Sequence, residues 1–303
     1  MAVLVATLDG YHIFSSSGEH HTALEGHRVE ALTPGPSGTW IAIVDEHEIW
    51  QHGDDGTWAA LAASDLDLRS LVTVDDDVFA GTVGPRVLKL DGAALTPLPG
   101  FDAVRGRDEW HPVGSPLVVR SFTATADGAA LLANVHVGGI VRSDDGGRSW
   151  HPTIDVDADV HEVRAHPSRG EIVMAAAAVG LCVSVDGGRD WEVVVDGLHA
   201  TYARAVAYDG DDVLVSASDG PFTRRSAIYR RSRNAPFERE GDGLPEWLEG
   251  NVDTRCLAVA NGRAALADGA GSVWVKSKPG GRKTGGWNLA FEGLQGVTAV
   301  AVI

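Results

Sequence analysis

The sequence predicts an all-β chain folded as a seven-bladed β-propeller of four-stranded antiparallel blades, in one domain that spans residues 1–303. Three observations support this fold class. Short β-rich apolar runs recur along the chain without convincing helical periodicity. Between them, 37 Gly and 13 Pro residues supply frequent turn signals. Similar first strands return about every 40 to 50 residues, which is the period of propeller blades.

The first strands of six successive blades align on one pattern. They read "RVEALTP" from residue 28, "DLRSLVTV" from 67, "VVRSFTAT" from 118, "DVHEVRAH" from 159, "YARAVAYD" from 202 and "DTRCLAVA" from 253. The corresponding blades are expected near residues 27–64, 65–104, 105–157, 158–201, 202–251 and 252–295. Residues 296–303 resemble a first strand, and residues 1–26 begin like a second strand. We therefore expect the N- and C-terminal strands to pair in a seventh blade and close the ring.

Composition excludes several classes of protein. The net charge of −17 disfavours the phosphate-neutralising surface that nucleic acid or an anionic membrane requires. No apolar stretch approaches the roughly 20 residues of a membrane-spanning helix, and the first residues lack a cationic signal region. We therefore expect a cytoplasmic protein that binds neither nucleic acid nor membrane. No phosphate loop, dinucleotide fingerprint or GxSxG elbow lies in a suitable context, so no cofactor is expected.

Two nearly identical stretches, "SDDGGRSW" at 143–150 and "SVDGGRDW" at 184–191, are interpreted as structural turns. Ser and Asp can hydrogen-bond turn amides, Gly allows a positive φ, and Trp can cover the hairpin. The residues assigned to this role are Ser143, Asp145, Gly147 and Trp150 in the first copy, and Ser184, Asp186, Gly188 and Trp191 in the second. A decayed third copy, "QHGDDGTW" at 51–58, keeps Thr57 and Trp58. "DDGG" has too few ligands for a calcium loop.

These stretches resemble the Asp-box, or BNR, repeat of sialidase-like and sortilin-like propellers and of propellers that act as assembly factors. The resemblance implies turns at the outer edge of the blades and a functionally mixed family. It also implies what sialidase activity would need: an arginine triad, a tyrosine nucleophile with a glutamate beside it, and an aspartic acid. The sequence lacks most of this set, so sialidase activity is not expected. The assembly factors imply an arginine-rich face that holds a partner.

A column of residues at corresponding first-strand positions is the main candidate site. It contains Glu30, Arg69, Arg120, His161, Arg204, Arg255 and Thr298. In a propeller these positions lie near the axis, so converging guanidinium groups could form a funnel for a small anion. The alternative is that each arginine pairs with a carboxylate of a neighbouring blade. The candidate partners are Asp9, Asp45, Asp219 and Asp268.

Histidines and tryptophans on the same face offer further candidates. His136 and His161 are expected on adjacent blades, where they could act as catalytic residues or hold a metal ion. No HxH or HExxH spacing fixes two ligands on one element, so no metal is assigned. Trp110 and Trp247 lie in the two longest connections, and each could stack on a planar ligand or pack against its own blade.

The leading hypothesis is a binding or scaffold module whose funnel takes a small anionic ligand or an acidic segment of a partner protein. Its ligand-binding residues would be Glu30, Arg69, Arg120, His161, Arg204, Arg255, Trp110 and Trp247. The alternative is a hydrolase or lyase, with or without metal, that uses His136 and His161. The sequence leaves open whether the protein is an enzyme.

Overall fold

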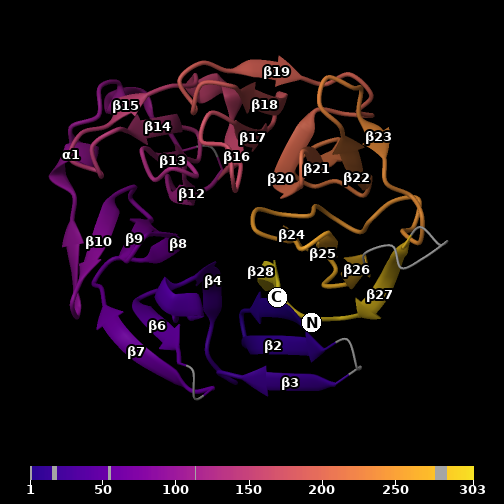
Figure 1. Cartoon of the computed structure of the whole chain (residues 1–303), viewed down its shortest axis with the longest axis horizontal. Helices are drawn as coiled ribbons and strands as arrows, with labels where there is room; N and C mark the ends of the chain where they lie inside the picture. Colours follow the sequence, from indigo (N-terminus) through magenta and orange to yellow (C-terminus); the bar gives the residue numbers. More distant parts are fainter. Residues whose placement is uncertain (1, 16–18, 54–55, 113, 277–284) are drawn as a thin grey trace. The chain divides into compact units, whose positions relative to one another are not determined.

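The computed structural model describes residues 2–15, 19–53, 56–112, 114–276 and 285–303 (Figure 1). Antiparallel strands dominate these ranges, which confirms the predicted all-β class. The helical elements among them are single turns, α1 (Pro99–Asp102), η1 (Pro36–Gly38), η2 (Arg107–Glu109) and η3 (Val156–Ala158). In the described ranges, no helix has the length and apolar character that crossing a bilayer requires. The chain divides into two compact units.

The first unit comprises residues 1–27, 176–181 and 193–303. One of its sheets has the order β28-β1-β2-β3, formed by β1 (Ala2–Thr7), β2 (Gly10–Ser15), β3 (His20–Ala23) and β28 (Val297–Val302). A second contains β20 (Tyr202–Asp209), β21 (Asp212–Ser218), β22 (Ser226–Arg231) and β23 (Glu238–Arg239). A third contains β24 (Leu257–Ala260), β25 (Arg263–Ala267), β26 (Val273–Lys276) and β27 (Trp287–Phe291). The antiparallel pairing of β28 with β1 confirms that the two chain ends share one blade.

The second unit comprises residues 28–175 and 182–192. Its largest sheet has eight strands, in which β4 (Val29–Pro34), β5 (Trp40–Val44), β6 (Glu48–His52) and β7 (Trp58–Ala63) form one four-stranded blade. The other blade of this sheet contains β8 (Leu68–Val74), β9 (Asp77–Thr82), β10 (Val87–Asp91) and β11 (Ala94–Pro97). A single parallel contact between Ala63 and Ala94 joins the two blades at their outer strands.

Two more four-stranded sheets complete the set. One contains β12 (Val119–Ala124), β13 (Leu131–Val135), β14 (Gly139–Ser143) and β15 (His151–Pro152). The other has the order β16-β17-β18-β19, with β16 (Val160–Ala165), β17 (Val173–Ala177), β18 (Gly180–Ser184) and β19 (Glu192–Val194). The described residues thus form seven four-stranded units, the number that the sequence predicts.

The inner strands of the blades are apolar because both of their faces are buried. Every residue of β13 and β17 is buried, as are four of the five residues of β5 and β25. In the second unit, Phe101 is fully buried and makes edge-on contact with Trp150, at 5.3 Å between ring centroids. These contacts hold the blades together through side-chain packing, since each blade on its own would leave an apolar face in water.

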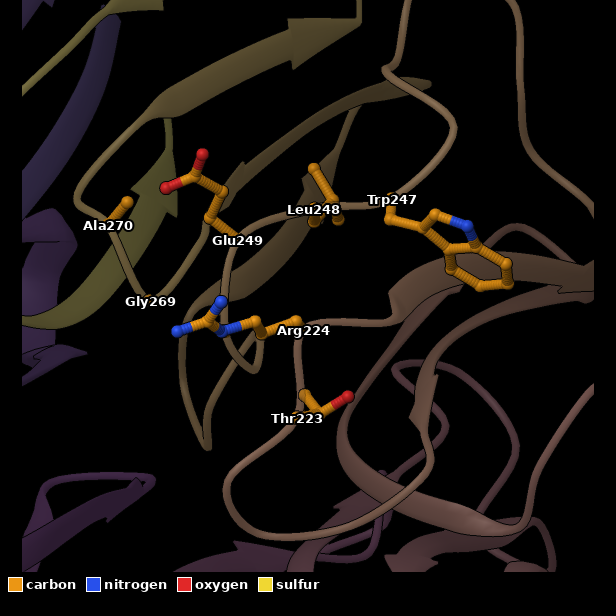
Figure 2. A pocket seen from close by; sticks show the side chains of 8 residues that line it. Thr223, Arg224, Trp247, Leu248, Glu249, Gly269 and Ala270 are labelled. Carbon is orange, nitrogen blue, oxygen red and sulfur yellow. The ribbon is translucent and has the colours of Figure 1, made fainter.

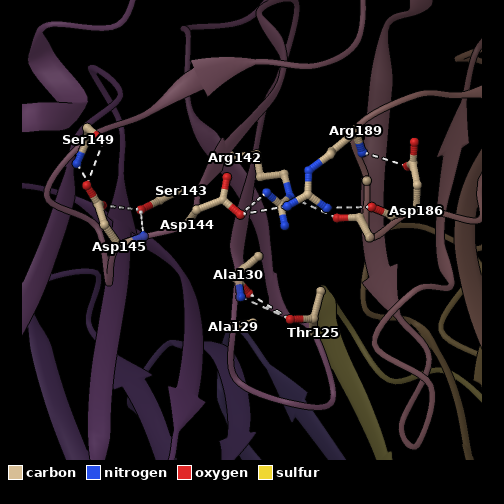
Figure 3. Close-up of polar contacts among 12 residues, drawn as sticks. Thr125, Ala129, Ala130, Arg142, Ser143, Asp144, Asp145, Ser149, Asp186 and Arg189 are labelled. Atoms are coloured by element: carbon tan, nitrogen blue, oxygen red, sulfur yellow. Dashed lines mark hydrogen bonds and ion pairs between the residues drawn. The ribbon is translucent and has the colours of Figure 1, made fainter.

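The turn at 143–150 is held by its own side chains (Figure 3). The Ser143 hydroxyl accepts a bond from the Gly147 amide at 2.8 Å and donates to Asp145 at 2.8 Å. Asp145 also accepts from the amide and the hydroxyl of Ser149, at 2.9 and 2.6 Å. The Trp150 indole donates to the Gly147 carbonyl at 3.0 Å, and Gly147 has a φ of 86°. The backbone amides of Gly147 and Ser149 are therefore satisfied within the turn.

The turn at 184–191 repeats this arrangement. Ser184 accepts from the Gly188 amide at 2.7 Å and donates to Asp186 at 2.7 Å. Asp186 accepts in turn from the amides of Arg189 and Asp190, at 3.0 and 3.1 Å. The third copy, at 51–58, includes residues 54 and 55, which lie outside the described residues.

Arg142 connects these two turns (Figure 3). Its side chain is 2% exposed, and its Nε donates to the carbonyl of Gly187 in the second turn at 2.9 Å. Its guanidinium also contacts Asp144 of the first turn, and Asp144 accepts from Arg189 at 3.1 Å. A buried cation thus links two successive blades through one carbonyl and one carboxylate.

Candidate functional site

The predicted column coincides with irregularities in the first strands. The pairing register shifts between Val29 and Ala31, Leu68 and Ser70, Val119 and Ser121, and Ala203 and Val206. Glu30, Arg69, Arg120 and Arg204 each lie within one of these shifts. A bulge turns the extra residue away from regular alternation and re-aims its side chain. The alignment of first strands on one pattern does not predict these bulges.

Arg69 is neutralised within the second unit. Its Nη1 lies 2.6 Å from Glu46 and 3.4 Å from Glu30, whose carboxylate also accepts from Arg28 at 2.9 Å. Glu46 has a left-handed backbone, with a φ of 64°, which places its carboxylate beside Arg69. Burial acts to raise the pKa of Glu46, but the hydrogen bond and charge of Arg69 outweigh it, so this pKa lies below its ordinary value. The four groups form an ion-pair network between adjacent blades.

Arg204 is neutralised within the first unit. Its Nη1 lies 2.8 Å from Asp253, its Nη2 donates to the Tyr202 hydroxyl at 3.2 Å, and its side chain is 17% exposed. Burial acts to lower the pKa of Arg204, but Asp253 and Tyr202 outweigh it and raise this pKa. The guanidinium therefore stays charged, and its charge is neutralised by the carboxylate of Asp253.

Arg69 and Arg204 thus form the ion pairs between blades that the alternative hypothesis expects. Their partners are Glu46 and Asp253, and not the carboxylates that the sequence suggests. Asp45 instead accepts from the backbone amide of Arg28 at 2.9 Å. Asp268 accepts from the amides of Ala270 and Ser272, both at 3.0 Å. These two carboxylates stabilise turns.

Arg255 does not lie on a first strand, so that part of the sequence prediction is wrong. The strand of its blade begins at Leu257, and Arg255 has a φ of 65° in the preceding turn. Asp253 organises this turn, because its carboxylate accepts from the Thr254 amide at 2.7 Å and its carbonyl accepts from the Cys256 amide at 2.9 Å. The Arg255 carbonyl accepts from Val300 on β28 at 2.9 Å.

Trp110 does not serve as an exposed stacking platform. It is 7% exposed and belongs to the apolar cluster of the second unit, with its ring 6.0 Å from that of Phe101. The Arg107 guanidinium covers it at 4.8 Å. The interpretation of Trp110 as a residue packed against its own blade is the one that the structure favours.

Trp247, in contrast, is half-buried among cationic and aromatic groups of the first unit. The guanidinium carbons of Arg225 and Arg239 lie 4.7 and 4.2 Å from its ring. His199 packs on it at 4.9 Å and also meets the Tyr229 hydroxyl at 2.8 Å. Two cations on one indole indicate a local excess of positive charge on an otherwise acidic chain.

A groove of about 570 Å³ opens beside Trp247 (Figure 2). Thr223 and Arg224 come from the β21–β22 connection, and Trp247 and Glu249 come from the β23–β24 connection. Gly269 and Ala270 of the β25–β26 connection line the rest of it. A smaller cavity of about 290 Å³, which Gly269 also lines, contains Arg204 and Asp253. Among the residues predicted for ligand binding, Trp247 lines the groove and Arg204 lines the smaller cavity.

His136 and His161 lie together in the second unit, as expected for adjacent blades. Their ring centroids are 6.0 Å apart, and Asp159 contacts both, with each Nε2 3.5 Å from one carboxylate oxygen. The hydrogen bond of His161 lowers the pKa of Asp159, and the charges of His136 and Arg120 add to this effect against the opposing effect of burial. The sequence analysis did not include Asp159, although it directly precedes β16, two residues before His161.

Comparisons with known proteins identify the fold. No protein-family model matches the chain, and no curated protein matches it in sequence. A solved ancestral GH74 enzyme aligns with 95% of the chain at 12% identity and a TM-score of 0.64, and the chain spans 40% of that enzyme.

Two further structures align over nearly their whole length. A candidate 6-phosphogluconolactonase from Bacteroides fragilis aligns with 99% of the chain, at 96% of its own length, 14% identity and a TM-score of 0.65. A second, from Bacteroides uniformis, aligns with 99% of the chain, at 98% of its own length, 15% identity and a TM-score of 0.62. At these identities the likeness shows the fold alone, and the chain is a seven-bladed β-propeller.

Proposed function

We propose that the protein is a binding module that holds an acidic segment of a partner protein in the groove beside Trp247. The observation that carries this proposal is Phe222, which is 98% exposed and directly precedes Thr223 and Arg224, two residues that line the groove. This proposal keeps the binding hypothesis of the sequence analysis. It moves the site from the column, where Arg69 and Arg204 are already paired with carboxylates, to the connections between strands.

The loop that carries Phe222 is braced. The Asn251 side chain donates to the carbonyls of Gly220 and Pro221 at 3.2 and 3.1 Å. Thr223, directly after Phe222, is buried and donates to Asp219. A fixed loop therefore presents the phenylalanine to solvent, and covering such a side chain is worth roughly 1.5–3 kcal/mol. Exposed aromatic residues on ordered loops are typical anchors of protein interfaces.

Charge favours an acidic partner. Arg224 is exposed in the groove, and Arg225 and Arg239 lie on Trp247, whereas the chain as a whole has a net charge of −17. A segment rich in Asp and Glu would meet these guanidinium groups, and an apolar residue within it would meet Phe222 and Trp247. Glu249 lines the same groove and would disfavour a purely anionic ligand, so an apolar contact is part of the proposal.

We infer that the turns at 143–150 and 184–191 are Asp-box repeats with a structural role. Their Ser, Asp and Gly side chains and amides bond to one another, which supports this assignment. The activities named for the structural relatives are not proposed for this chain, because identities of 12–15% support the fold alone.

The groove is tested by fluorescence anisotropy with a labelled 12-residue peptide. The peptide consists of glutamates on both sides of a central Leu-Phe pair. Phe222→Ser and Arg224→Ala are each expected to weaken binding about 5- to 10-fold, since each removes roughly 1–1.4 kcal/mol. Val185→Ser and Arg233→Ala are the matched controls, because both residues are exposed and lie outside the groove. Binding should also weaken as salt rises. Equal affinity in all four variants, or equal affinity for a lysine version of the peptide, would show that the groove does not bind acidic segments.

A further inference from the structure

A second candidate site lies in the second unit. It consists of His136, Asp159 and His161. His136 is in the turn between β13 and β14, and His161 is the second residue of β16, in the next blade. Asp159 ends the η3 turn with a left-handed backbone, at a φ of 48°, and directly precedes β16. Two blades therefore contribute to one cluster.

The spacing of the polar atoms fits a metal ion. The Nε2 atoms of His136 and His161 are each 3.5 Å from an oxygen of Asp159, and the three ligand atoms all lie within 4.8 Å of one another. Zinc binds imidazole nitrogen and carboxylate oxygen at about 2.0–2.2 Å, so tetrahedral coordination separates neighbouring ligand atoms by roughly 3.3–3.6 Å. Each imidazole nitrogen has this separation from one oxygen of Asp159, His136 from Oδ1 and His161 from Oδ2.

The surroundings hold the three groups in place. His161 is fully buried, the His136 side chain is 12% exposed, and Asp159 is half-buried. The Nδ1 of His136 lies 3.2 Å from the Ser115 hydroxyl, which orients the ring so that its Nε2 faces Asp159. Metal-binding histidines commonly use one nitrogen for the metal while a neighbouring polar group fixes the other.

We propose that His136, Asp159 and His161 form a binding site for a divalent transition-metal ion of the zinc class. Two imidazoles and one carboxylate suit Zn²⁺, Co²⁺ and Fe²⁺ better than Mg²⁺ or Ca²⁺, which prefer oxygen ligands. Three protein ligands leave at least one coordination position for water or an anionic oxygen ligand. The competing interpretation is a metal-free cluster in which the carboxylate bonds to the two imidazoles.

Metal binding is measured on the full chain, prepared without a histidine tag and stripped with a chelator. Zinc content after equilibrium dialysis and the visible spectrum of the Co²⁺ form report stoichiometry and geometry. The expected result is one equivalent of Zn²⁺ and a Co²⁺ spectrum with the intense bands of four- or five-coordinate cobalt.

Asp159→Asn and His136→Gln test the assignment without removing the fully buried His161. Each is expected to weaken Zn²⁺ binding by about 100-fold or more, since loss of a direct ligand exceeds the 10- to 100-fold effect of outer groups. Circular dichroism spectra of the metal-free variants should match that of the unaltered chain. The control is His12→Ala combined with His20→Ala, because the Nδ1 of half-buried His12 lies 3.1 Å from the Nε2 of exposed His20, and the two form a competing pair.

Two results would overturn the proposal. One is that the unaltered chain binds less than about 0.1 equivalent of zinc at micromolar concentration. The other is that the Asp159 and His136 variants bind zinc as tightly as the unaltered chain, while the His12 and His20 variant loses it. Neither result bears on the groove, because the peptide assay is run in the presence of chelator.

Discussion

Replacing Arg142 with methionine tests the link between the two turns, and we expect the free energy of unfolding to fall by about 1–4 kcal/mol. The magnitude follows from the groups that lose a partner. The buried Gly187 carbonyl loses the bond from Nε at 2.9 Å, which costs roughly 1–3 kcal/mol. Asp144 is 44% exposed and can be solvated, so its contact contributes only about 0–1 kcal/mol. Methionine retains much of the apolar packing of the arginine stem.

Urea and thermal unfolding followed by circular dichroism measure this loss. At about 2–4 °C per kcal/mol, the midpoint of thermal unfolding should fall by roughly 2–16 °C. Arg148→Met is the matched control, since Arg148 is exposed and its Nε donates within its own turn, to the Asp145 carbonyl at 2.8 Å. We expect that change to stay within about 0.5 kcal/mol. If both variants were equally stable, the buried guanidinium would not be what links the turns.

The remaining predictions concern the same turns. Hydrogen bonds from Ser149 lower the pKa of Asp145 to about 2, so the folded state binds this proton less readily than the unfolded chain, whose aspartates titrate near 3.9. The stabilisation is complete above about pH 4 and is lost as pH falls toward 2. The free energy of unfolding of Asp145→Asn, measured against pH, should therefore fall less in acid than that of the unaltered chain. The same pH dependence in both proteins would contradict this prediction. Gly188→Ala is expected to cost about 2 kcal/mol or more, because its new Cβ would lie 2.3 Å from Leu132 and its φ is 85°. Gly146 has a φ of 72° and open space around it, so Gly146→Ala should lower the free energy of unfolding by only about 1 kcal/mol. Equal losses in the two variants would show that the contact with Leu132 does not destabilise Gly188→Ala.

The sequence predicts the fold well because the fold is repetitive. Each first strand repeats one pattern of β-branched and apolar residues, and the turn signals between strands are strong. The pairing of β28 with β1 follows from the incomplete blades at the two ends. The strand pattern and the turn signals are local, so they can be identified in a single sequence.

The site depends on features that a local pattern does not record. Glu46 and Asp159 reach their partners through left-handed backbone conformations that tertiary contacts select. Arg255 was assigned to a strand because "DTRCLAVA" resembles the other first strands, but Asp253 forms a turn there instead. Trp110 follows a charged stretch and is nevertheless buried under Arg107. The acidic residue two positions before His161 is the signal in the sequence for the cluster of His136, Asp159 and His161.

The pairing of Val3 with Val302 has a consequence for how the chain acquires its structure. During synthesis β1 leaves the ribosome with β2 beside it, while its other hydrogen-bonding edge stays open until Val297–Val302 has been made. Such a distant contact has a large closure entropy and slows folding. Until this contact forms, β28 of another copy could pair with the open edge of β1. In a chain truncated before Val297 that edge stays open, so we expect it to pair with a strand of another molecule.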